Sequence, residues 1–495
     1  MNLKLNRRRF ITMLLSSAAA NVLSPIPSVT NAYATATVKD TVIIGGGISG
    51  LTSAFHLQDK NIVLLEAEEY FGGRTVSGEH NGWSYTKGTE YLSKPYGTFK
   101  RMLTELNLKA IEIPSPMDQI WHEGKLYSGD NGRLQLLAEK GGLDELNSFL
   151  ETLINIANSY DEVPDFDEES RIAYLDRLTC KEWFDQLQLP NIYSEIYNVT
   201  FRGLFGANIN EVSAMGAFPE IAFDFIGLDY PVTKEFLQKN KDERNESSGA
   251  YSFPNGITDV INALVGRLGD KVMTSAKVTG VKKTADGLYN VEYTSNGDTQ
   301  TIKTRSVIFA TPMPVTQRIG SQILTQYQQH LIDQVPYGPY VTAALFSDEP
   351  IFTDAFDLAL PDGLLPTDVY DSTWIQRKLG ESHKGYIASL YIAPFSYKDN
   401  YLLEATDDEL LERSYTELAE IWPDLKQKVR GYDIHRFTYA YPVSTVGAYS
   451  RLTKLYGTLN GGVQLAGDGM IYPVFETAIE AGVIAAKRVR NYLHI

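Results

Sequence analysis

The stretch Val42-Ile43-Ile44-Gly45-Gly46-Gly47-Ile48-Ser49-Gly50 decides the fold of this chain. An apolar run that enters a glycine turn predicts a buried strand leading directly into a helix. Gly45 would make the tight turn, Gly47 would let backbone N–H groups approach a pyrophosphate, and Gly50 would let the helix pack on the strand. The helix N-terminus adds partial positive charge facing the same phosphates. The stretch therefore predicts a dinucleotide-binding βαβ unit, with Ile48 and Ser49 also expected at the cofactor.

A second apolar run, Ile62–Leu65, ends at an acidic residue, Glu66. Glu66 follows Gly45 by 21 residues, close to the spacing of about 20 expected of the acid that binds an adenosine ribose. We therefore assign Glu66 and the adjacent Ala67 to the adenosine end of the cofactor. The alternative is an ordinary turn, because glycines also end strands that bind nothing.

The next motif, Gly72-Gly73-Arg74-Thr75, favours FAD over NAD. Here the chain resembles the flavin-containing amine oxidase superfamily, the monoamine oxidase-like flavoproteins. The resemblance implies that Gly73 lies at the cofactor and that Arg74 reaches the FAD pyrophosphate. A guanidinium suits this task because its fork matches phosphate oxygens and it stays charged. An arginine in a solvated turn is the alternative.

A second resemblance to the superfamily lies near the C-terminus, in Gln464-Leu465-Ala466-Gly467-Asp468 and Glu476–Gly482. In the superfamily this strand, loop and helix bring an acid to the ribityl chain and aim a helix N-terminus at the flavin pyrimidine. Gly467, Asp468 and Thr477 are the matching positions. A buried strand followed by a surface helix is the alternative. If both motifs hold one FAD, the two ends of the chain lie in one domain.

The resemblance also implies positions around the flavin ring. Two aromatic side chains flank the substrate amine in the superfamily, and they match Tyr449 and Val474, with Phe475 beside the latter. The aromatic cage is therefore half built, and core packing is the alternative role of Tyr449. The superfamily lysine that holds a water near flavin N5 matches Thr342, which makes fast oxidase activity doubtful and opens the possibility of a quinone or cytochrome acceptor.

The loop Lys87-Gly88-Thr89-Glu90-Tyr91 takes the place of a superfamily glycine loop beside the flavin. We assign Gly88, Thr89, Glu90 and Tyr91 to the cofactor site. Lys87 and Glu90 are unusual there, and a mutual pair, a substrate contact and solvent exposure stay open for them. Arg202 is a further open case, either a carboxylate ligand or a structural arginine. The superfamily also implies a backbone contact from Val278 to adenine.

Some relatives attach FAD through a cysteine that matches Ala448 here. We therefore expect non-covalent FAD. The only cysteine, Cys180, excludes an internal disulfide, and the seven histidines show no metal-ligand spacing, so no metal site is predicted.

The expected fold is α/β, a Rossmann-type FAD-binding domain built from discontinuous segments plus an α+β substrate domain. The FAD-binding segments are 38–105, 249–315 and 449–495, and the substrate-binding segments are 106–248 and 316–448. Strands are expected near 340–346 and 386–392, and helices across 143–154 and 409–421.

Residues 1–34 have the pattern of a twin-arginine (Tat) signal peptide. Asn6-Arg7-Arg8-Arg9-Phe10-Ile11 precedes a short apolar run and the small-residue site Ala32-Tyr33-Ala34. This predicts export of the folded protein to the periplasm or medium, with an uncleaved anchor or a basic tail as the alternative. No other segment reads as a membrane span. Cleavage would leave 41 basic and 61 acidic residues, a formal charge of −20, which argues against nucleic acid as a partner.

The sequence as a whole predicts an exported FAD-dependent amine oxidase or dehydrogenase. Its partners would be a small-molecule amine and either O2 or a periplasmic electron acceptor. Hydride transfer from an amine C–H to flavin N5 would give an imine. The alternatives are an L-amino-acid oxidase, a C–C desaturase of the same superfamily, or a non-catalytic FAD-binding protein. The oligomeric state is not predicted.

Overall fold

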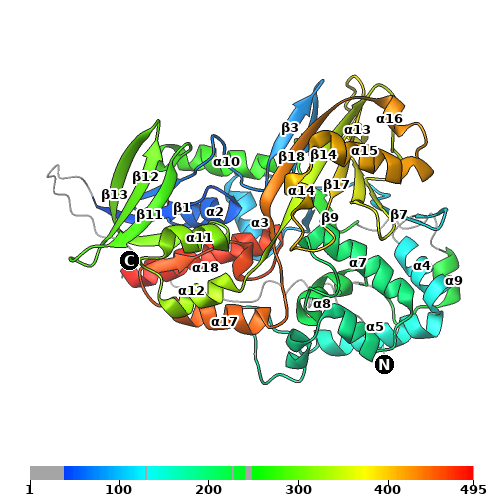
Figure 1. Ribbon diagram of the computed structural model, residues 1–495, viewed down its shortest axis with the longest axis horizontal. Coiled ribbons are helices and arrows are strands. Elements are labelled where there is room, and N and C mark those ends of the chain that lie inside the picture. The colour runs from blue at the N-terminus through cyan, green and yellow to red at the C-terminus, as the bar shows by residue number, and fades with distance from the viewer. Residues whose placement is uncertain (1–37, 129–130, 226–227, 240–247, 494–495) are drawn as a thin grey trace.

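The computed structural model describes residues 38–128, 131–225, 228–239 and 248–493 of the 495-residue chain (Figure 1). The predicted signal peptide, residues 1–34, lies outside the described residues and stays a prediction.

One sheet joins stretches from both ends of the described chain (Figure 1). β1 and β19 both pair with β13 in parallel, and β2 and β10 continue the parallel part on the other side of β1. The long β13 also extends into an antiparallel meander with β12 and β11. The strands are β10 (Val272–Met273), β2 (Ile62–Leu65), β1 (Lys39–Ile44), β13 (Asp298–Phe309), β12 (Tyr289–Ser295), β11 (Lys277–Lys283) and β19 (Val463–Leu465).

The parallel strands are apolar on both faces because helices and neighbouring segments cover both faces. Ile43 and Leu64 belong to a core that also holds residues of α2 (Ile48–His56), α10 (Thr258–Leu268) and α18 (Phe475–Leu493). Val42 and Ile44, which alternate with Ile43 along β1, belong to a second core on the opposite face. That face carries α11 (Met313–Gly320), α12 (Gln326–Asp333) and α17 (Ala448–Thr458).

A second sheet is built from 118–128 and 337–442 and lies at the upper right of Figure 1. Its strands, in order, are β18 (Val429–Pro442), β14 (Tyr337–Ser347), β17 (Tyr386–Ile392), β16 (Pro366–Asp371), β15 (Asp357–Ala359), β7 (Asp118–His122) and β8 (Lys125–Ser128). All neighbours are antiparallel except β15 and β7. One face packs on α15 (Asp407–Glu417) and the short helices α14 (Tyr401–Glu404) and α16 (Leu425–Lys428). α13 (Trp374–Lys378) follows β16.

A helical layer lies beneath this sheet in Figure 1. It holds α4 (Gly132–Gly141), α5 (Leu143–Ala157), α6 (Cys180–Gln186), α7 (Asn191–Phe205), α8 (Ala214–Phe223) and α9 (Lys234–Lys239). α5 buries Leu146, Phe149 and Leu153, as its 3.6-residue periodicity predicts. The remaining elements near the junction of the layers are β3 (Ser77–His80), β4 (Trp83–Thr86), β5 (Leu92–Ser93), β6 (Ile111–Glu112), β9 (Ala250–Ser252) and α3 (Gly97–Glu105).

The expected α/β fold class is confirmed, and the expected strands and helices are present. The strands expected near 340–346 and 386–392 are β14 and β17, and the helix expected across 409–421 is α15 with a 3₁₀ turn, Leu418–Glu420. The two ends of the chain were expected to lie in one domain, and β1 and β19 do pair with the same strand, β13. The boundaries drawn between the two domains stay a prediction.

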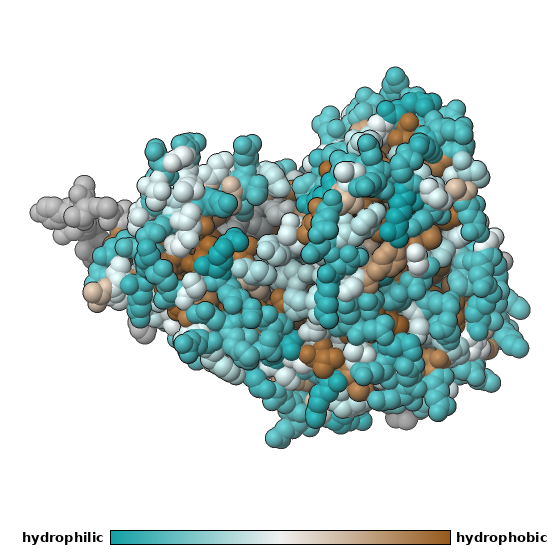
Figure 2. Space-filling view, viewed as in Figure 1, coloured by the Kyte–Doolittle hydropathy of each residue, from teal (hydrophilic) through white to brown (hydrophobic). Residues whose placement is uncertain are grey.

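The face of the molecule shown in Figure 2 is mostly hydrophilic, with apolar residues in small separate patches. Within the described residues, no helix combines the length and apolar character that crossing a membrane requires.

Candidate functional site

The glycine turn after β1 has the geometry of a phosphate-binding loop. Gly45 adopts φ +107°, and a Cβ on Gly50 would lie 2.0 Å from the Gly45 carbonyl oxygen, so neither position admits a side chain without rearrangement. Gly47 caps α2 without a side-chain hydrogen bond, and no acid lies in the first turn. The Ser49 hydroxyl is buried there and has no hydrogen-bond partner. The first N–H groups of α2, which no side chain caps, and the unpartnered Ser49 hydroxyl are donors that fit the pyrophosphate of a dinucleotide.

Glu66 closes this loop from the end of β2. Its carboxylate accepts the Gly46 N–H at 2.5 Å and the Glu68 N–H at 2.9 Å. Burial raises the pKa of Glu66, while these backbone N–H groups oppose the rise. The Glu66 carbonyl in turn accepts the Ala276 N–H at 2.7 Å, which brings β11 and Val278 close to the predicted adenosine end.

Arg74 and Asp468, far apart in the sequence, form one ion pair. The two guanidinium nitrogens lie 2.6 and 2.7 Å from the two Asp468 oxygens, and Nη1 also donates to the Ala440 carbonyl at 2.6 Å. Burial alone would lower the pKa of Arg74, and the Asp468 carboxylate more than reverses this. Gly467 adopts φ +118° beside open space, which leaves room next to the pair. The two predicted cofactor motifs therefore meet at this point.

The loop after β4 connects this pair to the second sheet. A Cβ on Gly88 would lie 2.0 Å from the Arg74 carbonyl oxygen, and the Thr89 N–H donates to that same oxygen. The Tyr391 hydroxyl lies 2.7 Å from both the Gly88 carbonyl and the Glu90 carboxyl. The Tyr391 hydroxyl is the donor in both contacts, so its single proton is shared between the two acceptors.

Burial raises the pKa of Glu90 to about 7, and the Tyr391 hydroxyl opposes the rise. Glu90 is therefore a proton-exchanging group near neutral pH, at the side of the predicted cofactor loop that faces the second sheet. Sequence reasoning placed Glu90 at the cofactor but did not identify Tyr391 as its partner.

Thr342 lies on the same face of the second sheet as Tyr391, directly opposite it in the register of β14 and β17. Its hydroxyl donates to the Lys87 carbonyl at 2.9 Å. The Lys87 ammonium pairs with Asp433 at 2.6 Å, so the open possibility of a Lys87–Glu90 pair is replaced by this contact.

Tyr449 and Phe475, both predicted at the aromatic cage, lie in hydrophobic cores, which favours the alternative of core packing given for Tyr449. The Tyr449 hydroxyl is bonded to that of Tyr160 at 2.5 Å, and its ring packs edge-on against Phe166 in the helical core. Tyr449 is 2% exposed, so it has no free face for a substrate. Phe475 packs against Phe99 in the core between α18 and the first sheet. Both side chains lie in cores, where large aromatic rings bury much apolar area and thereby stabilise the fold.

The remaining C-terminal positions have local roles in the structure. The Thr477 hydroxyl contacts the Tyr472 carbonyl and the Val474 carbonyl, and it thereby fixes the loop that enters α18. Val474 is half-buried, and its N–H donates to Tyr472. The assignments of Val474, Thr477, Ala67, Tyr91 and Val278 to the site stay predictions.

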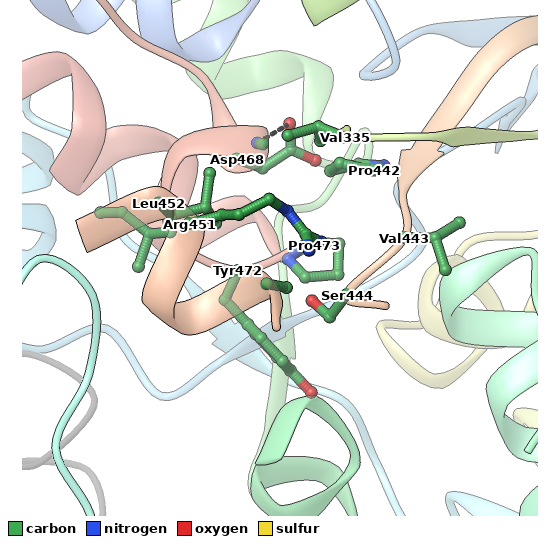
Figure 3. Close-up of a pocket in the computed structure, with 12 residues that line it drawn as sticks. Val335, Pro442, Val443, Ser444, Arg451, Leu452, Asp468, Tyr472 and Pro473 are labelled. Atoms are coloured by element: carbon green, nitrogen blue, oxygen red, sulfur yellow. Dashed lines mark hydrogen bonds between the residues drawn. The ribbon is translucent and has the colours of Figure 1, made fainter. Parts of the chain in front are cut away.

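A small cavity adjoins Asp468, between the 468–473 loop and the start of α17 (Figure 3). Pro442, Ser444, Arg451 and Pro473 line it. Figure 3 shows the Tyr472 side chain extending away from this cavity. The Tyr472 ring contacts Phe205 of α7, and its hydroxyl is buried without a partner.

Sequence reasoning missed a group of tyrosines on the second sheet. Tyr340, Tyr370 and Tyr391 share one face, and ring centroids lie 4.6 Å apart for Tyr370–Tyr391 and 6.0 Å apart for Tyr340–Tyr391. Tyr441 contacts Tyr340 at 5.5 Å. The sequence signal is the alternation of polar or aromatic and apolar residues in Tyr340-Val341-Thr342 and Asp368-Val369-Tyr370. Because residues two apart on a strand share a face, this alternation places the tyrosines on one side of the sheet.

Arg202 is a structural arginine. It is fully buried, its guanidinium donates to the carbonyls of Leu364, Leu365, Ala393 and Pro394, and it packs on the Phe395 ring. Its remaining nitrogen, Nη1, lies 3.7 Å from Asp362, so the surroundings of Arg202 favour the structural alternative.

Comparisons with known proteins indicate a flavin-dependent family. The family model described as flavin containing amine oxidoreductase matches residues 48–490. The chain is 24% identical to chloroplastic protoporphyrinogen oxidase 1 of Arabidopsis thaliana over 65% of this chain and 61% of that protein. It is 25% identical to the L-amino acid dehydrogenase of Synechocystis sp. over 68% of each chain. The match spans 61%, 56% and 58% of the first three curated relatives.

Among solved structures, an engineered triple mutant of putrescine oxidase superposes with a TM-score of 0.70 at 16% identity. The superposition covers 92% of this chain and 99% of that one. It establishes a shared fold that contains both sheets and the helical layer.

Proposed function

Because the chain belongs to the flavin-containing amine oxidoreductase family, and is thus an FAD-dependent oxidoreductase, we propose that it oxidises a small-molecule amine to an imine. The imine would hydrolyse in water to a carbonyl compound. The bound FAD supplies the acceptor for the hydride that leaves the substrate carbon. The protein supplies the cofactor site, the substrate orientation and the handling of the amine proton.

The observation that carries this proposal is the buried Glu90–Tyr391 pair beside Gly88. Substrate amines are ammonium ions near pH 7, and they must lose a proton before the neighbouring carbon releases a hydride. A carboxyl group with a pKa of about 7 is matched to that proton transfer. Glu90 therefore accepts the ammonium proton, and Tyr391 orients the carboxylate.

The cofactor would be held by residues on both sides of the first sheet. The α2 N-terminus and Arg74 would bind the pyrophosphate, Glu66 the adenosine ribose and Asp468 the ribityl chain. In this arrangement the Arg74–Asp468 contact joins two parts of one cofactor site.

The proposal is tested by anaerobic bleaching of the FAD-loaded enzyme with a panel of amines, polyamines and amino acids. Loss of the oxidised flavin band with amines is the expected result. An enzyme that is reduced by dithionite but by no amine would contradict the proposal.

Amino-acid oxidation is the second candidate function, and the Synechocystis relative favours it. Arg202 gives this candidate little support, because its Nε and Nη2 donate to backbone carbonyls and its Nη1 lies 3.7 Å from Asp362. Bleaching by amino acids alone in the same panel would reverse this ranking.

We further propose that FAD is bound without a covalent link to sulfur. Cys180, the single cysteine of the chain, is fully buried on α6 in the helical layer. Acid precipitation should leave a colourless pellet, and a yellow pellet would contradict this expectation.

The reoxidant is proposed to be a quinone or cytochrome rather than O2, because the position of the superfamily lysine is Thr342. Stopped-flow mixing of the reduced enzyme with air should show slow return of the flavin band, and rapid return would overturn the proposal.

Tat-dependent export is proposed from Arg7 and Arg8. Replacing both with lysine should retain the protein in the cytoplasm, as cell fractionation would report.

A further inference from the structure

Arg451, near the start of α17, is a cation beside the proposed cofactor site. Its side chain lines the small cavity that adjoins Asp468, and in Figure 3 it extends from α17 toward Pro473. Asp468 and Pro473 both belong to the segment between β19 and α18. Since Asp468 is the residue proposed to bind the ribityl chain, Arg451 shares a cavity with a segment assigned to FAD.

The guanidinium of Arg451 is held in place but keeps one donor free. Nη1 donates to the Val446 carbonyl at 2.9 Å, and Nη2 donates to the Thr445 hydroxyl at 2.8 Å. Nε is buried and has no hydrogen-bond partner. Buried polar groups are normally hydrogen-bonded, so this N–H indicates an acceptor that the protein itself does not supply.

A second free donor on the same cavity is the Ser444 hydroxyl. Ser444 is 7% exposed, and among the described residues its hydroxyl has no hydrogen-bond partner. Its backbone carbonyl accepts the Ser213 N–H at 2.8 Å, and a Cβ on Gly216 of α8 would lie 2.5 Å from the Ser444 Cβ, so α8 fixes its place. The other walls of the cavity are mostly apolar and include Val335, Ala448, Leu452 and Ile471. Two donors that open onto an apolar cavity match the polar edge of an aromatic cofactor.

The positive charge of Arg451 is balanced only in part. Asp176 acts on it electrostatically, but the two Asp176 carboxylate oxygens accept the Tyr449 and Ser450 N–H groups at 3.1 Å each. Within the part of the chain that the structure describes, Arg451 forms no ion pair. Burial lowers the pKa of Arg451 and Asp176 opposes this, and a guanidinium remains charged at any relevant pH. Its charge therefore acts on whatever group lies in or beside the cavity.

The proposed hydride transfer changes the charge of the cofactor. FAD that takes a hydride from the substrate carbon gains two electrons and one proton, so its net charge becomes more negative by one, while the substrate becomes an iminium cation. A fixed cation beside the cofactor stabilises the reduced form more than the oxidised form. Arg451 has both the charge and the free donor that this role requires.

We propose that Arg451 and Ser444 donate hydrogen bonds to bound FAD, and that the charge of Arg451 raises the reduction potential of the FAD. This inference rests on the proposed function, which supplies the hydride transfer. It adds two residues of the 443–451 segment to the cofactor site, and it gives the start of α17 a role in setting how readily the substrate reduces the enzyme.

The test is a redox titration of the FAD-loaded protein with dithionite and an indicator dye of known potential. Arg451→Gln removes the charge, and Arg451→Lys keeps the charge but loses the guanidinium fork. Ser444→Ala removes the second donor alone. Equilibrium dialysis of oxidised FAD and thermal unfolding are measured for every variant, because Arg451 also holds Thr445 and Val446.

Arg488→Gln is the matched control. Arg488 lies in the C-terminal half of α18, and its Nη1 donates to the Tyr456 and Leu459 carbonyls. The control therefore loses one positive charge and contacts with backbone carbonyls, as Arg451→Gln does, but away from the cavity. Its reduction potential should equal that of the wild type.

In Arg451→Gln, reduced FAD should lose about tenfold more affinity than oxidised FAD, since the lost interaction is between charges in a partly buried site. For a two-electron couple this lowers the potential by about 30 mV. Arg451→Lys should stay close to the wild-type potential. Ser444→Ala should weaken oxidised and reduced FAD alike, by about threefold to tenfold, because it removes one neutral hydrogen bond.

An unchanged potential in Arg451→Gln would overturn the role of its charge, and so would equal shifts in the Gln and Lys variants, which indicate lost structure instead. Unchanged FAD affinity in Ser444→Ala would overturn the Ser444 contact. Dithionite replaces the amine in this titration, so its result is independent of the proposed substrate. Failure of every amine to bleach the flavin would reject the proposed function and leave the measured potentials as they are.

Discussion

The structure raises the pKa of Glu90 toward neutral pH, where a carboxyl group can exchange protons with an amine. Glu90 is almost fully buried, and its carboxyl group lies beside a tyrosine hydroxyl rather than a cation. Burial therefore dominates and raises the pKa to about 7. The carboxyl is protonated below that pH, and it takes up charge in the range where amine substrates bind.

Glu90→Gln should reveal this shift in the pH dependence of stability. The folded protein holds a proton that the unfolded chain releases above its own pKa of about 4.5. Stability from this group is thus present at low pH and lost as the pH rises to about 7. The variant should match the wild type near pH 5 and be more stable near pH 8, by up to about 2–3 kcal/mol.

Thermal unfolding of both proteins at the two pH values is the measurement. An equal difference at pH 5 and pH 8 would show that Glu90 does not titrate as described. Flavin reduction by amines should also slow in Glu90→Gln and lose its dependence on pH near 7, since glutamine does not accept the ammonium proton.

Asp468 tests the cofactor site at the same scale. Asp468→Asn removes the charge from the bidentate contact with Arg74 and from the predicted ribityl contact. We expect FAD affinity to fall about tenfold or more, because the substitution removes a charge-assisted hydrogen bond. Equilibrium dialysis with fluorescence detection measures this. Glu417→Gln, at the Arg413–Glu417 pair on α15, is the control, and equal FAD loss in both would contradict the assignment.

At the scale of elements, the contact between α2 and α18 positions the phosphate-binding turn. A Cβ on Gly482 of α18 would lie 2.4 Å from the Ser49 carbonyl oxygen, so the two helices touch through backbone. Gly482→Ala should destabilise the protein by about 1–3 kcal/mol, because overpacking forces the helices apart. It should also weaken FAD binding, since Ser49 lies in the first turn of α2.

Gly266→Ala on α10 is the matched control for this substitution. No atom lies within 4 Å of the added Cβ, so alanine should stabilise the helix by about 0.5–1 kcal/mol. Chemical denaturation of both variants, with and without FAD, measures the effects. Equal behaviour of the two variants would show that close packing of α2 and α18 is not required.

The elements also show which parts of the molecule a sequence can predict. The turn from β1 into α2, with Glu66 after β2, is specified by neighbouring residues, so its spacing predicts its geometry. The sequence left Tyr449 open between a cage and a core because many of the 30 tyrosines suit either place, and Tyr449 packs in a core. The tyrosine group of Tyr340, Tyr370 and Tyr391 was missed altogether, since its members meet only through the register of β14, β16 and β17.

At the scale of the whole molecule, FAD should act as a structural link between the ends of the chain. β1, β13 and β19 come from separate segments, and the Arg74–Asp468 pair crosses the same junction. A ligand that binds only the folded state stabilises it by about 2.7 kcal/mol at a hundredfold excess over Kd. The FAD-free protein should therefore melt at a lower temperature, and FAD should restore the Tm in a concentration-dependent way. A Tm independent of FAD would contradict this link.

Amine oxidation is tested most directly by a single anaerobic turnover of the FAD-loaded enzyme with one equivalent of a primary amine that bleaches the flavin, followed by assay of the carbonyl product. We expect one aldehyde to form for each flavin reduced, and none from the same amine without the enzyme. Flavin reduction without aldehyde, or with a new C–C double bond in the product, would contradict it.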